Sequence, residues 1–372
     1  MNDKYHMNND STLYMTALSM MKSIGPSMAR KLINAAGSAK EVFELKTLNH
    51  AMYKIPAKVL DELRDSQTMV SAEKELEFAR KNNIQVLTYY DPTFPFRLKQ
   101  CSDSPLVIFA KGSGALESKH MLAIVGTRKA TSYGRSVCKK LIEDLKGLDL
   151  TIISGLALGI DGTAHESAIE SNLNTIGVLG HDLTRIYPHQ HSELYKKVEH
   201  NGLLISEFSR EAMYTVGNFP SRNRIIAGMA DATVVIESAE KGGSLITADI
   251  SNSYNREVFA FPGRISDEFS RGCNSLIKGQ GAAMIEGAQD LIEMMNWNNS
   301  ERPVNIQIDL FECLNESEKE IAQLIKKNDN VGMDFLLTHS ALNISTLCNI
   351  LLQLEFKNII TSLPGKVYSI KA

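Results

Sequence analysis

The sequence contains few cysteines and no pairing motif among them. The five are far apart, and no two are spaced as Cys-x-x-Cys: Cys101, Cys138, Cys273, Cys313 and Cys348. An odd number of dispersed cysteines does not predict a disulfide framework or a cysteine-based zinc site. We therefore expect free thiols in a reducing compartment, and neither a metal nor a cofactor.

Long apolar runs and an excess of one charge are also missing. No apolar run approaches the ~18 residues that a membrane span needs, and residues 1–10 lack the apolar core of a signal peptide. We expect a cytosolic protein with no membrane partner. The net charge of -3 means that any nucleic-acid contact must come from a local basic patch. With 372 residues, 43% of them hydrophobic, the chain can form two or three packed domains.

Residues 1–83 show helical patterning and no convincing strand, which predicts an N-terminal helical domain. The segment Ser23-Ile24-Gly25-Pro26-Ser27 is followed by apolar residues at helical spacing. It looks like the turn of a helix-hairpin-helix, whose amides can hold a phosphate, although a second copy near Ile55 has no glycine. Contact with DNA and plain helical packing (SAM-like) both stay open here.

Residues 84–297 alternate short β-branched runs with helical stretches. The runs are apolar throughout, as expected of strands covered on both faces. This alternation predicts a doubly wound, mostly parallel Rossmann-like α/β sheet. The expected strands are Gln85–Tyr89, Leu106–Ala110, Leu122–Val125, Thr151–Ser154, Thr175–Leu179, Leu203–Ser206, Thr233–Ile236, Val258–Phe261 and Ala283–Ile285.

Residues 298–315 predict a polar linker, and residues 316–372 predict a winged helix. Three helical segments are followed by a hairpin around Pro364-Gly365. A winged helix that reads duplex DNA presents basic residues on its third helix, but Asn343–Phe356 carries none. The tail therefore favours protein contact or a structural role.

Glycines follow three of the predicted strands. Gly126-Thr127-Arg128 comes after the first, with Tyr133-Gly134 shortly beyond, while Gly155 and Gly180 follow the next two. In open α/β sheets such turns meet at the carboxyl edge, where ligands bind and helix N-termini attract phosphates. Their recurrence predicts a binding surface, although a tight turn alone also requires glycine.

Basic residues are expected at the same edge. Arg222, Asn223 and Arg224 lie at a predicted helix start, and Lys241-Gly242-Gly243-Ser244 precedes another helix. Together with Arg128 they predict a basic pocket for a phosphodiester chain, with Tyr133, Phe208, Tyr214 and Phe219 as candidate stacking residues. The structural alternatives are a solvated helix end and a serine-capped turn.

Other groups of polar residues in the sequence do not predict a catalytic or metal-binding site. Asp161 and His165 are spaced i, i+4, which favours a local Asp–His pair. His181, His189 and His191 lack further metal ligands at a suitable spacing. The sequence contains neither a nucleophile elbow nor a Walker A lysine.

Taken in order, these motifs resemble those of the DNA-processing protein A family (DprA, also called Smf) over roughly residues 85–297. The matching segments are Ala123–Arg128 with Tyr133-Gly134, Ser154–Ala157 with Gly159–Asp161 and His165, Phe219–Ile226, Gly243–Ala248, Phe261–Gly263 and Gly272–Ile277. Thr127 stands where serine is common in the family, and His191 where asparagine is usual.

The resemblance implies a protein that binds single-stranded DNA without sequence preference, forms homodimers and loads the recombinase RecA, in natural transformation and recombination. It implies no enzymatic activity. Transferred to this sequence, Arg128, Arg222, Arg224 and Lys241 would contact the DNA backbone. Five glycines would let that backbone come close: Gly126, Gly155, Gly180, Gly242 and Gly243.

Two enzyme classes are the alternatives. A nucleotide-processing hydrolase of the lysine-decarboxylase-like (LOG) group needs a later glycine and a catalytic glutamate, and both are missing after Gly242-Gly243. A dinucleotide oxidoreductase needs a complete Gly-x-Gly-x-x-Gly turn and an acidic residue after the second strand, which ends at Ser154-Gly155.

Overall fold

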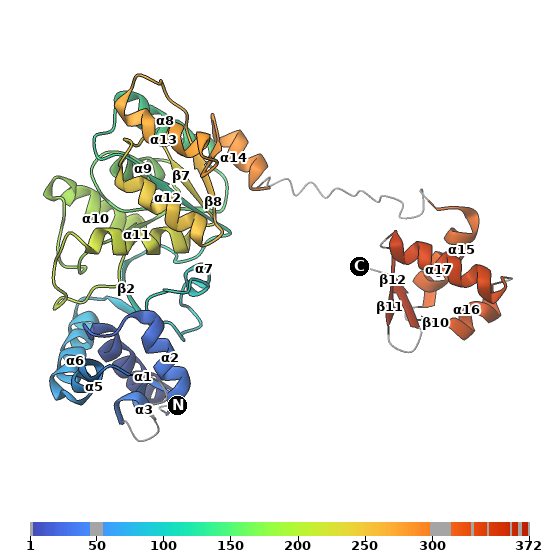
Figure 1. Ribbon diagram of the computed structural model, residues 1–372, viewed down its shortest axis with the longest axis horizontal. Helices are drawn as coiled ribbons and strands as arrows, with labels where there is room; N and C mark the ends of the chain where they lie inside the picture. Colours follow the sequence, from blue (N-terminus) through green and yellow to red (C-terminus); the bar gives the residue numbers. More distant parts are fainter. Residues whose placement is uncertain are drawn as a thin grey trace. The chain divides into compact units, whose positions relative to one another are not determined.

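The computed structural model describes residues 3–44, 55–297, 314–328, 331–340, 342–357, 359–363 and 367–370. The chain divides into two compact units, Met1–Trp297 and Asn298–Ala372 (Figure 1). Each unit has its own hydrophobic core. The predicted linker lies outside the described residues except for Leu314 and Asn315, and so do Cys313 and the Pro364-Gly365 turn.

The first unit contains a nine-stranded sheet in the order β1-β2-β6-β5-β4-β3-β7-β8-β9. Its strands β3 to β9 pair in parallel, whereas β1 with β2 and β2 with β6 pair antiparallel. The prediction of a mostly parallel sheet is confirmed, with every strand within two residues of its expected bounds. The strands are β1 (Gln85–Thr88), β2 (Val107–Gly112), β3 (His120–Val125), β4 (Leu150–Ser154), β5 (Asn174–Val178), β6 (Leu203–Ser206), β7 (Ala232–Val235), β8 (Glu257–Ala260) and β9 (Ala283–Met284).

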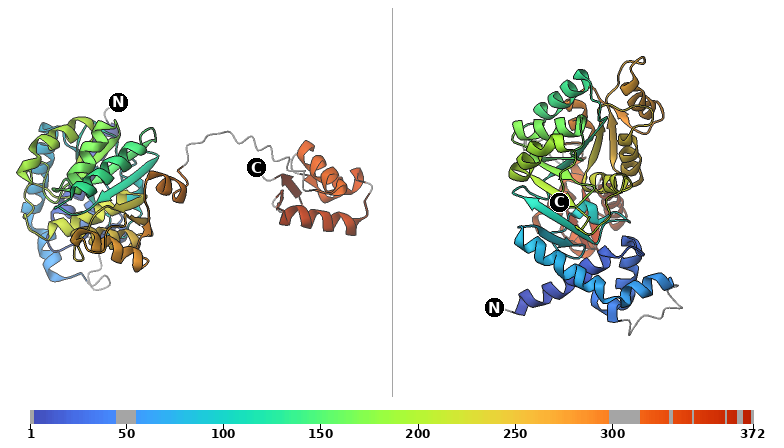
Figure 2. Two further views of the ribbon diagram at one scale, coloured as in Figure 1. Left: turned by 90° about the horizontal axis from the view of Figure 1, so that it is seen from above. Right: turned by 90° about the vertical axis from the view of Figure 1, so that its left-hand side faces the viewer.

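Helices cover both faces of this sheet because its strands are apolar on both sides (Figure 2). Along β3, Leu122 and Ile124 join one core, while Ala123 and Val125 join the other. The first core lies under α8 (Ser132–Asp144), α9 (Ile160–Glu170) and α14 (Ala288–Met294), and α10 (Ser192–Asn201) packs beside α9. The second core lies under α7 (Phe96–Lys99), α11 (Asn218–Met229), α12 (Gly243–Ser253) and α13 (Arg271–Lys278).

The N-terminal helices pack against the antiparallel edge of the sheet, where Val107 and Phe109 of β2 join their apolar core. In the predicted hairpin turn, the Glu62 carboxylate accepts hydrogen bonds from the backbone N–H groups of Lys22 (3.1 Å) and Ser23 (2.9 Å). This internal carboxylate favours a structural role for the turn. The helices are α1 (Asp3–Met20), α2 (Pro26–Ala36), α3 (Ala39–Glu44), α5 (Ala57–Arg64) and α6 (Ser66–Lys81).

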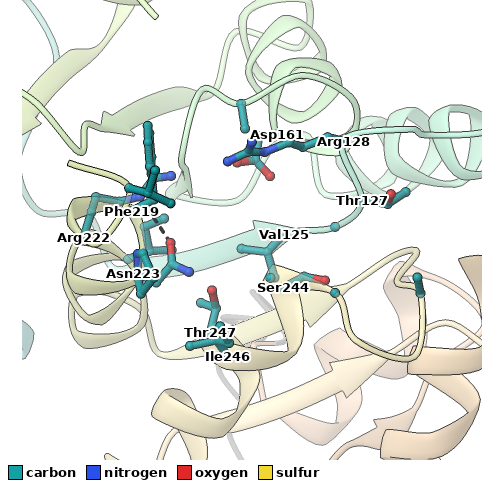
Figure 3. Close-up of a pocket in the computed structure, with 18 of the residues that line it drawn as sticks. Val125, Thr127, Arg128, Asp161, Phe219, Arg222, Asn223, Ser244, Ile246 and Thr247 are labelled. Carbon is teal, nitrogen blue, oxygen red and sulfur yellow. Dashed lines mark hydrogen bonds between the residues drawn. The ribbon is translucent and has the colours of Figure 1, made fainter. Parts of the chain in front are cut away.

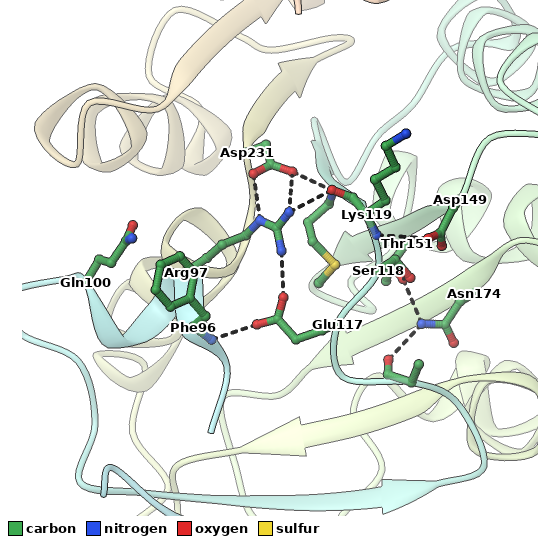
Figure 4. Close-up of polar contacts among 12 residues, drawn as sticks. Phe96, Arg97, Gln100, Glu117, Ser118, Lys119, Asp149, Thr151, Asn174 and Asp231 are labelled. Carbon is green, nitrogen blue, oxygen red and sulfur yellow. Dashed lines mark hydrogen bonds and ion pairs between the residues drawn. The ribbon is translucent and has the colours of Figure 1, made fainter. Parts of the chain in front are cut away.

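A charged network fastens the short helix α7 to the amino ends of the strands (Figure 4). Arg97 donates two hydrogen bonds to Asp231, at 2.6 and 3.0 Å, and one to Glu117 at 2.6 Å. Asp231 also accepts from the backbone N–H of Met121 at 2.8 Å. The network holds the edge of the sheet opposite the predicted binding edge.

The described residues of the second unit form three helices and a three-stranded antiparallel sheet in the order β10-β12-β11. Its elements are α15 (Glu316–Asn328), β10 (Val331–Gly332), α16 (Met333–His339), α17 (Ile344–Phe356), β11 (Ile360–Leu363) and β12 (Val367–Ile370). The two-residue strand β10 was not predicted, and the winged helix stays our interpretation of this unit. Among the described residues no single helix is long and apolar enough to span a bilayer; only α16 and α17 together, bent by 117°, meet that test by length and composition.

Candidate functional site

A pocket lies where the chain reverses its direction of travel across the sheet. From β3 the sheet continues through β4, β5 and β6 on one side and through β7, β8 and β9 on the other. The loops that leave β3 and β7 therefore diverge, and such switch points are where open α/β sheets bind ligands. A cavity of about 410 Å³ lies here, and we call it the switch-point pocket (Figure 3). Its lining includes Gly126, Arg128, Asp161, Tyr187, Phe219 and Gly243.

One wall of this pocket is aromatic. Phe219 packs 5.6 Å from the Tyr187 ring and 6.0 Å, edge-on, from the Tyr214 ring. Tyr187 is 42% exposed and Tyr214 is 37% exposed, so ring surface remains open to a ligand. Open aromatic faces are the platforms on which single-stranded bases stack. Of the four candidate stacking residues, Phe219 lines the pocket and Tyr214 packs against it, whereas neither Tyr133 nor Phe208 is among the described lining residues.

Cationic side chains lie beside the aromatic wall. The exposed Arg128 guanidinium is 5.6 Å from the Phe219 ring centroid, and that of Arg185 is 4.6 Å from the Tyr214 centroid. Lys241 is exposed on the turn that leads into the lining residue Gly242. The pocket thus combines positive charge with ring faces, which suits an anionic chain that carries flat bases.

Arg222 and its neighbour Asn223 line the pocket, but Arg222 is only 4% exposed. Its Nη1 donates to the carbonyl of Gly155 at 2.6 Å and to that of Val178, and its Nε donates to Asn223 Oδ1 at 3.2 Å. Burial lowers the pKa of Arg222, while the nearby Asp161 acts in the opposite direction. The guanidinium therefore links the carboxyl ends of β4 and β5 by hydrogen bonds, and too little of it is exposed to contact a phosphate.

Asp161 and His165 do not form the local pair that their spacing predicted. His165 pairs through Nδ1 with Thr175 Oγ1 at 2.7 Å, and burial lowers its pKa to about 3, so the ring is neutral. Burial raises the pKa of Asp161, and the charge of Arg222 opposes that shift. The prediction of an Asp–His pair is therefore wrong: Asp161 is electrostatically coupled to Arg222 instead.

Arg224 points away from the switch-point pocket and into an ion pair. It pairs with Glu207 and donates to the Asp103 carbonyl at 2.5 Å. Both charged side chains of the pair are 14% exposed. Burial raises the pKa of Glu207, and Arg224 opposes that shift. The structure therefore brings Arg128, but not Arg224, to the ligand surface.

Most of the predicted glycines lie where other protein atoms leave no room for a side chain. A Cβ built on Gly155 would lie 2.4 Å from Arg222 Nη1, and one on Gly126 would lie 2.5 Å from Ile160 Cγ1. Gly134, Gly180 and Gly242 likewise face Glu237, Phe219 and Ser238. Within the described residues, no atom lies within 4 Å of a Cβ built on Gly243, which lines the pocket at the start of α12.

The remaining predicted residues lie in or beside the pocket. Thr127 lines it and accepts from the Lys129 N–H at 3.2 Å. Ser244 also lines it, but its buried hydroxyl donates to Ser238 Oγ at 2.9 Å. Tyr133 belongs to a neighbouring cavity.

Sequence reasoning missed Arg185, Tyr187 and Ile246. Arg185 and Tyr187 lie in the loop that follows β5, and Gly180 at the start of this loop was among the predicted site residues. An arginine two residues before a tyrosine, in a segment that follows a predicted strand, was the available signal. Ile246, 43% exposed on α12, gave no signal beyond helical spacing.

The fold and the site define a Rossmann-like protein with a cationic, aromatic pocket at its switch point. The family model described as DNA recombination-mediator protein A matches residues 85–296, and the chain belongs to this family. It is 29% identical over 402 residues to protein Smf of Synechocystis, covering 97% of this chain and 99% of the relative. It is 38% identical over 221 residues to the DNA processing protein DprA of Bacillus subtilis, covering 59% and 74%.

Solved structures of the same family superpose on the chain. DprA from Streptococcus pneumoniae matches with a TM-score of 0.60 and 27% identity, over 75% of this chain and 95% of that one. DNA processing protein A from Helicobacter pylori, described for its single-stranded DNA binding mode, matches with a TM-score of 0.52 and 28% identity, over 57% and 96%. These relatives place the chain among proteins of DNA processing and recombination.

Proposed function

We propose that the chain binds single-stranded DNA in the switch-point pocket. Bases pack on the Tyr187–Phe219 wall, while Arg128 and Lys241 balance the phosphates. The observation that supports this most is the Arg128 guanidinium beside the Phe219 ring at the mouth of a pocket between diverging loops. Binding of this kind is largely independent of sequence, because phosphates and base faces are common to all nucleotides.

The partners are proposed from the family resemblance. They are the recombinase RecA, loaded onto the bound strand, and a second copy of the chain in a homodimer, with roles in recombination and natural transformation. A non-enzymatic role, a cytosolic location and the domain limits at residues 83, 297 and 315 stay predictions. The LOG-type hydrolase is less favoured because Asp161, the one carboxylate among the described lining residues, is buried beside Arg222.

The test is fluorescence anisotropy with labelled oligo-dT and a matched duplex over a salt series. Arg128→Ala should weaken oligo-dT binding about five- to twentyfold and flatten the salt dependence, since each phosphate contact releases counterions. Arg80→Ala is the matched control, because Arg80 is an exposed arginine on α6 that is outside the pocket lining.

The proposal predicts tight, salt-sensitive binding of the single strand in preference to the duplex, weakened by Arg128→Ala and unaffected by Arg80→Ala. Equal losses in both variants would indicate general surface charge and would contradict a localised site. If the folded protein binds neither DNA at low salt, the proposal is wrong.

A further inference from the structure

A second cavity of about 760 Å³ lies along the same loops as the switch-point pocket, and we call it the loop cavity. The same two loops line both. The loop after β3 contributes Thr127 and Arg128 to the pocket and Thr131 to the loop cavity. The loop after β7 contributes Ala239 to the pocket and Glu237 to the loop cavity. A strand that leaves the pocket along these loops therefore reaches the loop cavity next.

The outer wall of the loop cavity is held open by protein contacts. Asn274 binds Gly263 in both directions, accepting from its N–H at 3.1 Å and donating to its carbonyl at 2.9 Å. The backbone N–H of Ser238 donates to the Phe269 carbonyl at 2.7 Å. A cavity fixed in this way costs little reorganisation when a ligand enters.

Three exposed side chains give the loop cavity its chemistry. Tyr133 is 54% exposed, and its hydroxyl donates to the Pro262 carbonyl at 3.4 Å, which orients the ring. Arg264 and Asp267 are exposed on the opposite loop. The buried Glu237 carboxylate is already used by the Thr131 N–H, at 2.9 Å, and by the Thr131 hydroxyl.

Asp267 is placed to accept from a ligand. It stands at the capping position of the 3₁₀ turn Glu268–Ser270, yet its side chain makes no capping hydrogen bond within the described part of the chain. A carboxylate has two acceptor oxygens side by side and binds best to two adjacent donors. Guanine presents two adjacent N–H donors, on N1 and N2, on its pairing edge. Thymine presents one N–H between two carbonyl oxygens, and a carboxylate repels these oxygens because both groups are acceptors.

We propose that the loop cavity is a guanine-preferring subsite for the same DNA strand. The base stacks on Tyr133 and donates to Asp267, and Arg264 balances the neighbouring phosphate. This inference rests on the proposed function, because the strand must first occupy the switch-point pocket. It adds a local base preference to binding that is otherwise independent of sequence.

The test uses an oligo-dT of about 12 nucleotides, within the usual site size of a single-strand binding domain. One dT is replaced by dG at each position in turn, and affinities of the full-length protein are measured by anisotropy. In the wild type, dG at one or two adjacent positions should bind about five- to tenfold tighter than dT, within the range of a good bidentate contact. Asp267→Asn should abolish this advantage without weakening the binding of all-dT, because it removes the carboxylate that repels the thymine carbonyls.

Glu268→Gln is the matched control, since Glu268 is an exposed neighbouring carboxylate that is outside the cavity lining. It should keep the dG advantage, whereas Tyr133→Ala should reduce it. Normal all-dT binding without a dG advantage at any position, or an advantage that survives Asp267→Asn, overturns the subsite and leaves the proposed function standing. Loss of all oligonucleotide binding by the wild type overturns both.

Discussion

Arg222→Ala is expected to destabilise the protein strongly, although the sequence predicted Arg222 as a DNA contact at the carboxyl edge of the sheet. The guanidinium is 4% exposed and donates to the Gly155 and Val178 carbonyls at the ends of β4 and β5. The substitution leaves both carbonyls without their donor and removes the cation beside Asp161. Each unsatisfied buried group costs about 1–3 kcal/mol, so we expect a loss of about 3–5 kcal/mol in the free energy of unfolding.

Urea titration followed by tryptophan fluorescence measures this loss. The single tryptophan, Trp297, is 5% exposed and stacks on His120 with the ring centroids 4.6 Å apart, so it reports on the first unit. Arg128→Ala is the control and should change stability by less than about 0.5 kcal/mol, because Arg128 is exposed. An Arg222→Ala protein that unfolds within 0.5 kcal/mol of the wild type, on the order of a surface substitution, would refute the structural role of this arginine.

Three further predictions concern the titratable residues His165 and Glu207 and the role of the second unit. His165 has a pKa of about 3 in the folded protein and ~6.5 in the unfolded chain, so the unfolded chain binds a proton first as the pH falls. At pH 5 this lowers the free energy of unfolding by about 2 kcal/mol. His165→Gln should remove this loss when the free energy of unfolding is measured by urea titration as a function of pH. A profile that is the same in both proteins would contradict the neutral buried ring. Glu207→Gln should lower stability by about 2 kcal/mol because it leaves the Arg224 charge without its partner, and an unchanged urea midpoint would exclude that pair as a stabilising contact. A chain ending at Trp297 should bind oligo-dT within about twofold of the full-length chain, because a third helix without basic residues adds no phosphate contact; a loss of tenfold or more in anisotropy would assign DNA contacts to the tail.

The sheet was predictable because its strands are buried on both faces, and such strands are recognisable as apolar runs in the sequence. Strands covered on both faces are short apolar runs such as Leu150–Ser154, and these are visible without any partner information. The pairing direction was less accessible, since β2 begins with four buried residues like its parallel neighbours but pairs antiparallel with both β1 and β6. Strand β10 was missed because two residues carry no periodicity.

The lining of the candidate site was predictable only in part. The positions after β3 and β7 follow from the rule that parallel strands end at one edge, and this rule located Arg128 and Gly243 correctly at the pocket. It could not separate Arg128 from Arg222, since the burial of Arg222 depends on two carbonyls distant in sequence. Arg224 was assigned to the pocket for the same reason, because it lies on α11 whereas its partner Glu207 follows β6.

The most direct test of the proposed site is photocrosslinking of an iodouracil-substituted oligonucleotide to the full-length protein, with peptide mapping by mass spectrometry. Iodouracil crosslinks to aromatic rings that stack on it. Tyr187 and Phe219 line the switch-point pocket, and Tyr214 packs against both rings. We expect crosslinks in peptides that contain these rings, and we expect unlabelled oligo-dT to abolish them by competition. Crosslinks confined to α1–α6 or to the second unit would contradict the proposed site.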